Sequence, residues 1–407
     1  MRILVVGSGG VGSAVAAIAR RRPFFERMVV ADLDPTRAAR SVSATGDDRF
    51  GSVALDASSA AAVADCARAE GCDVILNAAD PRFVPPVFDA ALDAGGTYLD
   101  MAMSLSHPHP TRPFELPGEK LGDRQFARAA EWEERGLLAL VGMGVDPGLS
   151  DVFARYAADR LFSQIDRVDV RDGGDLAVDG YHFAPTFSIW TAIEECLNPP
   201  LLWDRDGGWT TTEPFSEPET FVFPEGIGPV DCVNVEHEEV VLIPRWVDCR
   251  HVTFKYGLGQ EFIDVLRTLH LVGLDRTEPV PVRGASVSPR EVVAACLPDP
   301  ATLGDRMHGR TCVGARVTGE GVDGGPREVY LHHVVDNDET VGRDGCQAVV
   351  WQTALGPVVA LELLASGVWQ GAGVLGPEAF AAEPFLDLLV DSCSPWALEE
   401  RIPDTEP

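Results

Sequence analysis

Four glycines follow directly on an aliphatic segment at the start of the chain, in VVGSGGVGSAVA. Gly7, Gly9 and Gly12 match the spacing G-x-G-x-x-G, which by itself is a weak signal. Its context strengthens it, because Arg2–Val6 has the pattern of a short strand, a helical pattern follows, and Asp32 ends the next strand. The arrangement predicts a strand–turn–helix unit that binds a dinucleotide.

Each glycine has its own physical reason in such a unit. Gly7 permits the turn, Gly9 leaves room for a pyrophosphate because it has no Cβ, and Gly12 lets the helix pack close to the strand. At the start of the helix, Gly10 and Val11 offer backbone N–H groups to the phosphates, and the helix dipole favours their negative charge. The alternative is a glycine-rich turn that holds no ligand.

The identity of the residue after the second strand bears on the choice of cofactor. A carboxylate at Asp32 can accept both ribose hydroxyls of NAD and repels the 2′-phosphate of NADP. Arg37, five residues further on, could offset that repulsion by binding a 2′-phosphate. The sequence therefore favours NAD, with NADP as the alternative.

Over roughly residues 1–145, strands of four or five residues alternate with helices, which is typical of an α/β Rossmann domain with a doubly wound parallel sheet. Ligands bind outside the carboxyl ends of such strands. Asp56, Asn77, Ala78 and Asp100 lie at these ends. We expect Asp56 at the adenine and Asn77 with Ala78 near the nicotinamide, although each position is equally consistent with capping a loop.

Over residues 146–345, short strands no longer alternate regularly with helices. We expect these residues to form a second α+β domain for substrate binding and dimerisation. Apolar alternation at Ile165–Val170, Glu238–Ile243 and Val252–Tyr256 predicts strands of a largely antiparallel sheet. Residues 346–407 begin with a strongly apolar helical pattern at Gln347–Ser366. This segment is predicted to return to the first domain.

Composition limits the classes of function. The formal net charge is −30, which disfavours nucleic acid as a partner. No apolar run reaches the roughly 18 residues of a membrane span, and no signal peptide is evident, so we expect a soluble cytoplasmic protein. The nine cysteines and nine histidines form no zinc-binding pattern, so no metal is predicted.

A second motif, GMGVDPGLSD at 142–151, follows the last predicted strand of the first domain. Asp146 stands immediately before Pro147, where an Asp commonly caps a helix. The motif also lies at the mouth of the predicted cofactor cleft. The second interpretation of Asp146 is therefore a carboxylate that reaches a substrate amine.

Several longer segments carry a resemblance to a known family. VVGSGGVGSAVA, GMGVDPG and GGDLAVDGYHFAPTFSIWTAIEE resemble the saccharopine dehydrogenase family. FKYGLGQEFIDVLRTLHLVGL, CLPDPATLG and CQAVVWQTALGPVVALELLASGVWQGAGV are similar to its carboxynorspermidine dehydrogenase members. The resemblance covers nearly the whole chain and implies a homodimer that reversibly oxidises an amine carbon with NAD(P).

This chemistry implies roles for particular residues. An iminium ion needs a nearby carboxylate, which Asp146 could supply, and a substrate carboxylate needs a cation such as Arg245. Lys255 is the preferred catalytic or carboxylate-binding residue. Only two of the 33 basic residues are lysine, so a lysine at this position, where the chain would ordinarily use arginine, indicates a specific role. The segment around Tyr181, Ser188 and Trp190 is expected to line the substrate cavity.

Other functions remain compatible with the same sequence. Within enzymes, the alternatives are a lysine dehydrogenase and a homospermidine synthase-like transferase that retains its NAD. A different class is a non-catalytic dinucleotide-binding sensor or scaffold, which would bind NADH without turning over any amine–carbonyl pair.

Overall fold

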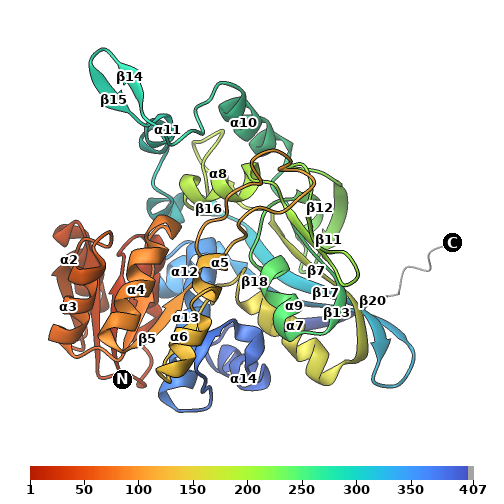
Figure 1. Cartoon of the computed structure of the whole chain (residues 1–407), viewed down its shortest axis with the longest axis horizontal. Coiled ribbons are helices and arrows are strands. Elements are labelled where there is room, and N and C mark those ends of the chain that lie inside the picture. The colour runs from red at the N-terminus through yellow and green to blue at the C-terminus, as the bar shows by residue number, and fades with distance from the viewer. Residues whose placement is uncertain (402–407) are drawn as a thin grey trace.

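The computed structural model describes residues 1–401 and arranges them around two main sheets (Figure 1). Within this range, the first sheet has seven strands, all parallel. In the order in which they lie side by side, they are β19 (Gly373–Leu375), β6 (Leu138–Leu140), β5 (Thr97–Asp100), β4 (Val74–Asn77), β1 (Arg2–Val6), β2 (Arg27–Asp32) and β3 (Phe50–Ala54).

Helices connect these strands, as the alternating pattern predicts. They are α1 (Gly10–Ala19), α2 (Pro35–Thr45), α3 (Ala60–Glu70), α4 (Val84–Ala94), α5 (Asp123–Phe126) and α6 (Ala129–Glu134), with a 3₁₀ turn η1 (Pro81–Phe83). Local chemistry sets their ends: Asp34 and Ser59 cap the first turns of α2 and α3, and left-handed glycines end α2, α3 and α4. The predicted Rossmann fold is confirmed.

The second sheet has nine strands within the described residues and is mixed. Its continuous path is β10 (Gly208–Thr211), β9 (Leu201–Asp204), β13 (Cys249–Tyr256), β7 (Phe162–Gly174), β17 (Arg310–Gly321), β18 (Pro326–Asp336) and β20 (Ala397–Arg401). In addition, β12 (Gly228–Asn234) pairs with β13, and β11 (Glu219–Phe223) pairs with β12. Only β13 and β7 pair in parallel among these strands, so the expectation of a largely antiparallel sheet holds.

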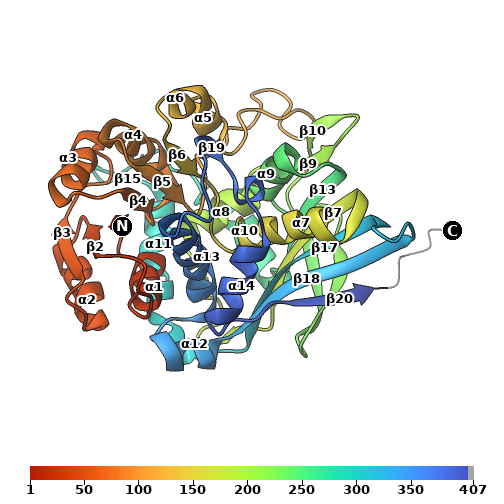
Figure 2. The ribbon, with the colours of Figure 1, turned by 90° about the horizontal axis from the view of Figure 1, so that it is seen from below.

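Helices cover this sheet and separate it from the first one (Figure 2). Within the described residues, the helices of this half are α7 (Leu149–Arg160), α8 (Ile189–Leu197), α9 (Glu239–Trp246), α10 (Gln260–Leu271), α11 (Pro289–Cys296), α12 (Asn337–Asp344), α13 (Ala348–Ala365) and α14 (Glu383–Asp391). Of these, α10 and α11 pack on α8. Short elements complete the fold: β8 (Ala177–Val178), β14 (Val280–Val282), β15 (Ala285–Val287), β16 (Met307–His308), η2 (Pro300–Thr302), η3 (Gly304–Arg306) and η4 (Pro377–Ala379).

The predicted strand at Glu238–Ile243 is wrong, because this segment forms α9. Its run of consecutive apolar residues is compatible with a buried strand and a buried helix alike. The helix is buried from Glu239 to Ile243, so both polar and apolar positions face protein. This difference matters for function, since the residues just before α9 enter the cavity described below.

Helix α13 links the two halves of the molecule. It is long and apolar enough to cross a membrane, yet 78% of that stretch is buried inside the protein, as in a core helix. A Cβ placed on Gly10 of α1 would lie 3.2 Å from Val350 of α13. A Cβ placed on Gly356 would lie only 2.2 Å from the carbonyl oxygen of Gly144. Backbone contact at these glycines therefore sets the position of α13.

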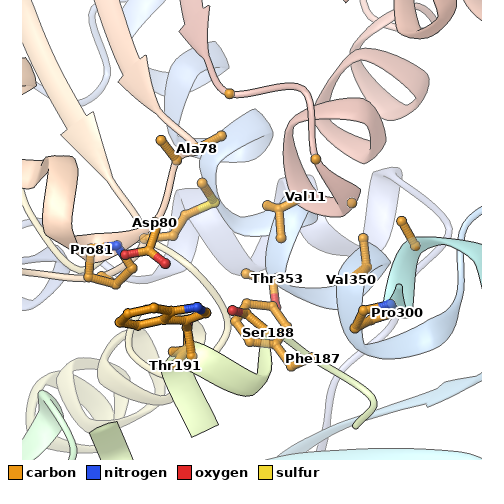
Figure 3. Close-up of a pocket in the computed structure, with 18 of the residues that line it drawn as sticks. Val11, Ala78, Asp80, Pro81, Phe187, Ser188, Thr191, Pro300, Val350 and Thr353 are labelled. Carbon is orange, nitrogen blue, oxygen red and sulfur yellow. The ribbon is translucent and has the colours of Figure 1, made fainter. Parts of the chain in front are cut away.

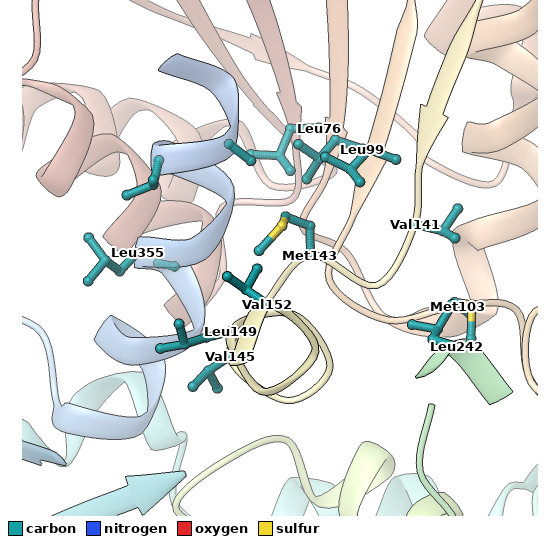
Figure 4. Close-up of a cluster of buried hydrophobic side chains, with 14 of the residues drawn as sticks. Leu76, Leu99, Met103, Val141, Met143, Val145, Leu149, Val152, Leu242 and Leu355 are labelled. Carbon is teal, nitrogen blue, oxygen red and sulfur yellow. The ribbon is translucent and has the colours of Figure 1, made fainter. Parts of the chain in front are cut away.

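Apolar side chains from both halves meet beside α13 (Figure 4). Leu76 and Leu99 come from the first sheet, Met143 and Val152 from the junction and α7, and Leu355 from α13 itself. All five are buried and belong to one continuous core. The junction carrying Asp146 is therefore held by packing from both sides.

The C-terminal segment contributes to both sheets. β19 pairs with β6 of the first sheet, while β20 pairs with β18 of the second. The sequence predicts that this segment returns to the first domain, where β19 pairs with β6 and α13 packs on α1. The pairing of β20 with the second sheet is not indicated by the sequence. Residues 402–407 of the predicted segment lie outside the described residues.

We expect Gly356→Ala to lower the free energy of unfolding by about 1–3 kcal/mol, because the new methyl group meets backbone that no rotamer change can relieve. Gly342→Ala in α12 is the matched control: nothing lies within 4 Å of its Cβ position. That change should be neutral or slightly stabilising. Thermal and urea unfolding of the two variants beside the parent measure the difference, and equal stability of all three would contradict the packing argument.

Candidate active site

A cavity of about 770 Å³ lies between the carboxyl ends of the first sheet and the second half of the chain. Figure 3 shows Val11 and Ala78 from the first half across the cavity from Ser188 and Thr191 of the second. Val350 and Thr353 of α13 complete the view. The size is in the range of about 300–1,000 Å³ that ligand and cofactor sites occupy.

The turn between β1 and α1 has the geometry that a dinucleotide requires. Gly7 has φ +104°, and a Cβ there would lie 2.6 Å from the carbonyl oxygen of Ala78. A Cβ on Gly12 would lie 1.9 Å from the carbonyl oxygen of Gly7. At Gly9 the closest heavy atom to such a Cβ is 3.7 Å away, so its backbone faces open space. The residues present therefore fit a pyrophosphate at this turn.

At the start of α1, Gly10 and Val11 both line the cavity, and no side chain caps the helix. The first backbone N–H groups thus remain available to an anion, as predicted from the sequence. Val350 of α13 lies against Gly10 and closes the cavity on this side.

Two carboxylates, Asp32 and Asp56, line the end of the cavity where the adenosine is predicted to bind. Asp32 lines the cavity and accepts hydrogen bonds from the backbone of Ser8 and Asp34 at 2.8 and 2.9 Å. Burial acts to raise the pKa of Asp32, but these hydrogen bonds outweigh it and lower the pKa below its ordinary value. Asp56 and Arg37 line the same end. Asp32 is therefore ionised at neutral pH beside the ribose position.

Two of the three residues predicted at the next strand ends reach the cavity. Asn77 and Ala78 line it, and the Asn77 amide is held by Tyr98 and the backbone of Ala79. The prediction for Asp100 needs correction, because its side chain is 1% exposed and does not line the cavity. Asp100 instead accepts hydrogen bonds from Gln125 and the Gly142 backbone, at 2.8 and 2.7 Å, and so anchors the junction.

Asp146 lines the cavity, on the junction that follows β6. Burial raises the pKa of Asp146 well above its ordinary value, and the charge of Asp172 on β7 raises it further. Burial also raises the pKa of Asp172, to about 6, although hydrogen bonds from Asp146 and Tyr256 oppose this. The two carboxyl groups are therefore neighbours whose pKa values are both raised, and the Tyr256 hydroxyl lies beside Asp172.

His237 also lines the cavity and is 2% exposed. Its Nδ1 lies 2.5 Å from Oε2 of Glu239, and its ring stacks on Phe254 with centroids 3.8 Å apart. Burial acts to lower the pKa of His237, but the charge and hydrogen bond of Glu239 outweigh it and raise the pKa well above its ordinary value. His237 is consequently an imidazolium at neutral pH.

Further carboxyl groups approach the cavity from α8 and the loop before α9. Glu195 and Glu238 line it, and both also line a smaller side chamber of about 30 Å³ with Glu236. Burial raises the pKa of Glu195 to about 8 and that of Glu236 to about 7, and it raises the pKa of Glu238 as well. These groups are buried with few cations near them, which favours a cationic ligand.

The aromatic segment predicted to line the cavity does so in part. Ser188 and Trp190 are at its wall. The Trp190 ring lies between two guanidinium groups, with the central carbons of Arg82 and Arg290 at 3.8 and 4.9 Å from its centroid. Tyr181 is 41% exposed and outside the cavity, so that prediction needs correction: the segment turns outward before it reaches α8.

The prediction that Lys255 belongs to the active site is wrong in this structure, because its side chain does not line the cavity. It lies on β13 next to Tyr256, and because successive side chains of a strand point to opposite faces, only Tyr256 faces the cavity. Lys255 Nζ instead binds Oε2 of Glu219 and the carbonyl oxygen of Glu217, at 2.8 and 2.7 Å. Its role in this structure is to pair with the half-buried carboxylate of Glu219, away from the cavity.

Arg245 is also placed away from the cavity. It lies in the last turn of α9, where its guanidinium carbon is 3.7 Å from the ring centroid of Phe126. Of the basic side chains in the described part of the chain, Arg37 and His237 are the ones that line the cavity. A carboxylate-binding role for Arg245 or Lys255 is therefore not supported by this geometry.

The sequence prediction missed His237, Glu238 and Glu239, because it assigned their surroundings to a strand. The signal was present as EHEE at 236–239, a histidine among three glutamates beside an apolar run. Asp80, Thr191 and the segment 294–301 also line the cavity. Thr191 and part of 294–301 lie in segments that carry the family resemblance, but no pattern among these residues indicated that they line a cavity. Among residues 1–401, no group of His, Cys, Asp and Glu has an arrangement that could hold a metal ion.

Two domain models of one protein family match most of the chain. The model of the saccharopine dehydrogenase NADP-binding domain matches residues 3–140, and that of the saccharopine dehydrogenase C-terminal domain matches residues 144–393. The chain belongs to the saccharopine dehydrogenase family. It is an NAD(P)-dependent oxidoreductase that acts on a carbon–nitrogen bond, as the sequence predicts.

Its relatives are similar over nearly their full length. The chain is 28% identical to carboxyaminopropylagmatine dehydrogenase of Synechocystis sp., covering 97% of this chain and 96% of that protein. It is also 28% identical to carboxynorspermidine synthase of Vibrio cholerae, covering 81% and 78%. Apo saccharopine dehydrogenase (L-Glu forming) from Saccharomyces cerevisiae has the same fold, with a TM-score of 0.69 at 15% identity over 98% of this chain and all of that one.

We expect the enzyme to prefer NADH to NADPH, because the ionised Asp32 repels a 2′-phosphate. Asp32→Asn keeps an acceptor for Ser8 but removes the charge, so the ratio of kcat/KM for NADPH to that for NADH should rise about tenfold or more, equivalent to about 1.4 kcal/mol. Asp387→Asn, on the exposed face of α14, is the matched control. A parent enzyme that already prefers NADPH would contradict the assignment of Asp32.

Proposed function

We propose that this protein reduces an imine, formed from a polyamine-type amine and a small aldehyde or keto acid, to a carboxylated secondary amine, and catalyses the reverse oxidation. One observation carries the proposal: buried carboxyl groups from several elements line the same cavity as the dinucleotide turn. They favour a substrate that carries more than one positive charge. When bound at Gly7, Gly9 and Gly12, NAD(P)H supplies the hydride.

The shape of the acidic region suggests how such a substrate would be held. Asp146 lines the main cavity, and Asp172 of β7 lies beside it. We expect the reacting nitrogen next to this pair. Glu195 and Glu238 lie where the side chamber opens from the main cavity. A second cationic group would lie at this opening, against Glu195 and Glu238, while the first stays near Asp146. The names of the relatives, which contain agmatine and norspermidine, agree with a chain of this kind.

A screen of NADH and NADPH oxidation tests the proposal. Agmatine, putrescine, diaminopropane and lysine are each paired with aspartate semialdehyde and with 2-oxoglutarate, and saccharopine is tested in the oxidative direction. We expect turnover with a diamine or agmatine and little with lysine. Turnover with lysine alone would favour a lysine dehydrogenase, product formation without net NADH loss would favour a homospermidine synthase-like transferase, and cofactor binding without turnover would favour a sensor.

The pKa of Glu195 predicts a dependence on pH. With a pKa of about 8, Glu195 is mostly neutral at pH 7 and ionised at pH 9, while the substrate amines stay largely cationic. KM for the diamine should therefore fall about tenfold between these pH values.

Glu195→Gln removes this titrating group without changing its size. In that variant, KM at pH 9 should rise about tenfold and its fall with pH should largely disappear. Glu291→Gln, on an exposed face of α11, is the matched control. A pH dependence of KM that is the same in Glu195→Gln and the parent would exclude Glu195 from the subsite.

We further propose that the enzyme works in the cytoplasm as a homodimer. Its nine cysteines are all free thiols, which agrees with a reducing compartment. The dimer is implied by the family resemblance, and light scattering of the purified protein tests it.

A further inference from the structure

His237 has the geometry of an acid–base catalyst. The Nδ1 atom is held by Glu239 at 2.5 Å, which fixes the orientation of the ring and directs Nε2 away from that carboxylate. Among the described residues, Nε2 has no hydrogen-bond partner, and the side chain lines the cavity. A buried histidine with one nitrogen anchored on a carboxylate and the other facing a ligand cavity is the arrangement that proton transfer requires.

Packing fixes the ring in this orientation. The imidazole lies parallel to the Phe254 ring, at an interplanar angle of 10°. Glu239 is fully buried, and its other oxygen, Oε1, accepts a hydrogen bond from Ser150 at 2.8 Å. Ser150 lies in the first turn of α7, beside Asp151. The carboxylate that orients His237 is therefore itself oriented from a second element.

The charges around the ring come from every element packed on it. They are Glu238 and Glu239 of the α9 region, Asp146 of the junction, Asp172 of β7, Glu195 of α8 and the hydroxyl of Tyr256 on β13. Acidic groups thus surround one imidazole. This environment favours its charged form, so His237 can begin the reaction as an acid.

We propose that His237 is the residue that moves protons at the substrate, and that Glu239 is its positioning residue. The inference rests on the proposed function, because it assigns a role within imine formation. In the reductive direction, the amine nitrogen adds to the carbonyl carbon, and one proton passes from that nitrogen to the carbonyl oxygen, which gives a neutral carbinolamine. The carbinolamine C–O bond then breaks, and its electron pair takes the proton from Nε2 and leaves as water.

The proton balance closes within this site. The nitrogen lone pair forms the C=N bond as water departs, leaving His237 neutral. The imidazole recovers a proton from the next substrate, whose ammonium group must lose one before its nitrogen can attack. The proton lost by the ammonium therefore equals the proton carried away by water. No oxidant or reductant takes part in these steps, which precede the reduction.

Variants of His237 and Glu239 test this role with the substrate pair that the parent enzyme turns over. His237→Gln should lower kcat about 100-fold or more, within the range of general acid–base catalysis. The dissociation constant for NADH, measured by fluorescence, should stay within twofold. His237→Ala should regain part of its kcat when imidazole is added, because the cavity can admit it.

Glu239→Gln should lower kcat less, and it should move the alkaline limb of the kcat–pH profile down by about one unit, since the imidazolium loses its counter-charge. A merely structural role for Glu239 would change stability without moving this limb. If the His237 variants do not fold, the kcat–pH profile of Glu239→Gln still tests the proposed role of His237.

The chain offers a matched control, because His251 has its Nδ1 2.9 Å from Oδ2 of Asp204 but lies outside the cavity. His251→Gln and Asp204→Asn should leave kcat and its pH profile unchanged. The proposal for His237 is overturned if His237→Gln raises KM alone and keeps the kcat–pH profile, which would make it a substrate-binding group. If the parent itself turns over no amine–carbonyl pair, the proposed function fails instead.

Discussion

The contact of helix α13 with backbone on both of its sides holds the site together. Gly10 at the start of α1 lies against Val350, and Gly356 lies against the carbonyl oxygen of Gly144. A third contact joins α13 to the second sheet, where the Gln352 amide donates to the carbonyl oxygen of His333 at 3.0 Å. The dinucleotide turn, the junction that carries Asp146 and the second sheet are thus placed relative to one another by a single buried helix.

Within that frame, the cavity concentrates carboxyl groups that have little compensating charge. Burial raises the pKa of Asp146, Glu195 and Glu238, so the unliganded site holds protons that a cationic substrate would displace. The same groups keep His237 charged. In the proposed reaction, substrate recognition and proton transfer would therefore both depend on one electrostatic property, the excess of acidic over basic groups at the cavity.

The errors of the sequence prediction have a common cause. The prediction of Lys255 relied on its rarity, but rarity carries no information on which face of a strand a side chain occupies. Asp100 was placed at the correct strand end, yet it turns inward to hold Gln125 and Gly142. His237 was missed because an apolar run after it suits a buried strand as well as a buried helix. In each case, the contacts include a residue distant in sequence: Glu219 for Lys255, Gln125 for Asp100 and Phe254 for His237.

The sequence by itself determined the dinucleotide unit, its NAD(P) chemistry and the family. These follow from glycine spacing and strand–helix alternation, where each constraint acts over a few residues: Gly7, Gly9 and Gly12 meet their steric limits within one turn. Only the tertiary structure decided which acids and which base face the substrate. Asp146, Glu195 and His237 come from three separate segments, and their shared cavity exists only once α13 and the second sheet have packed against the first.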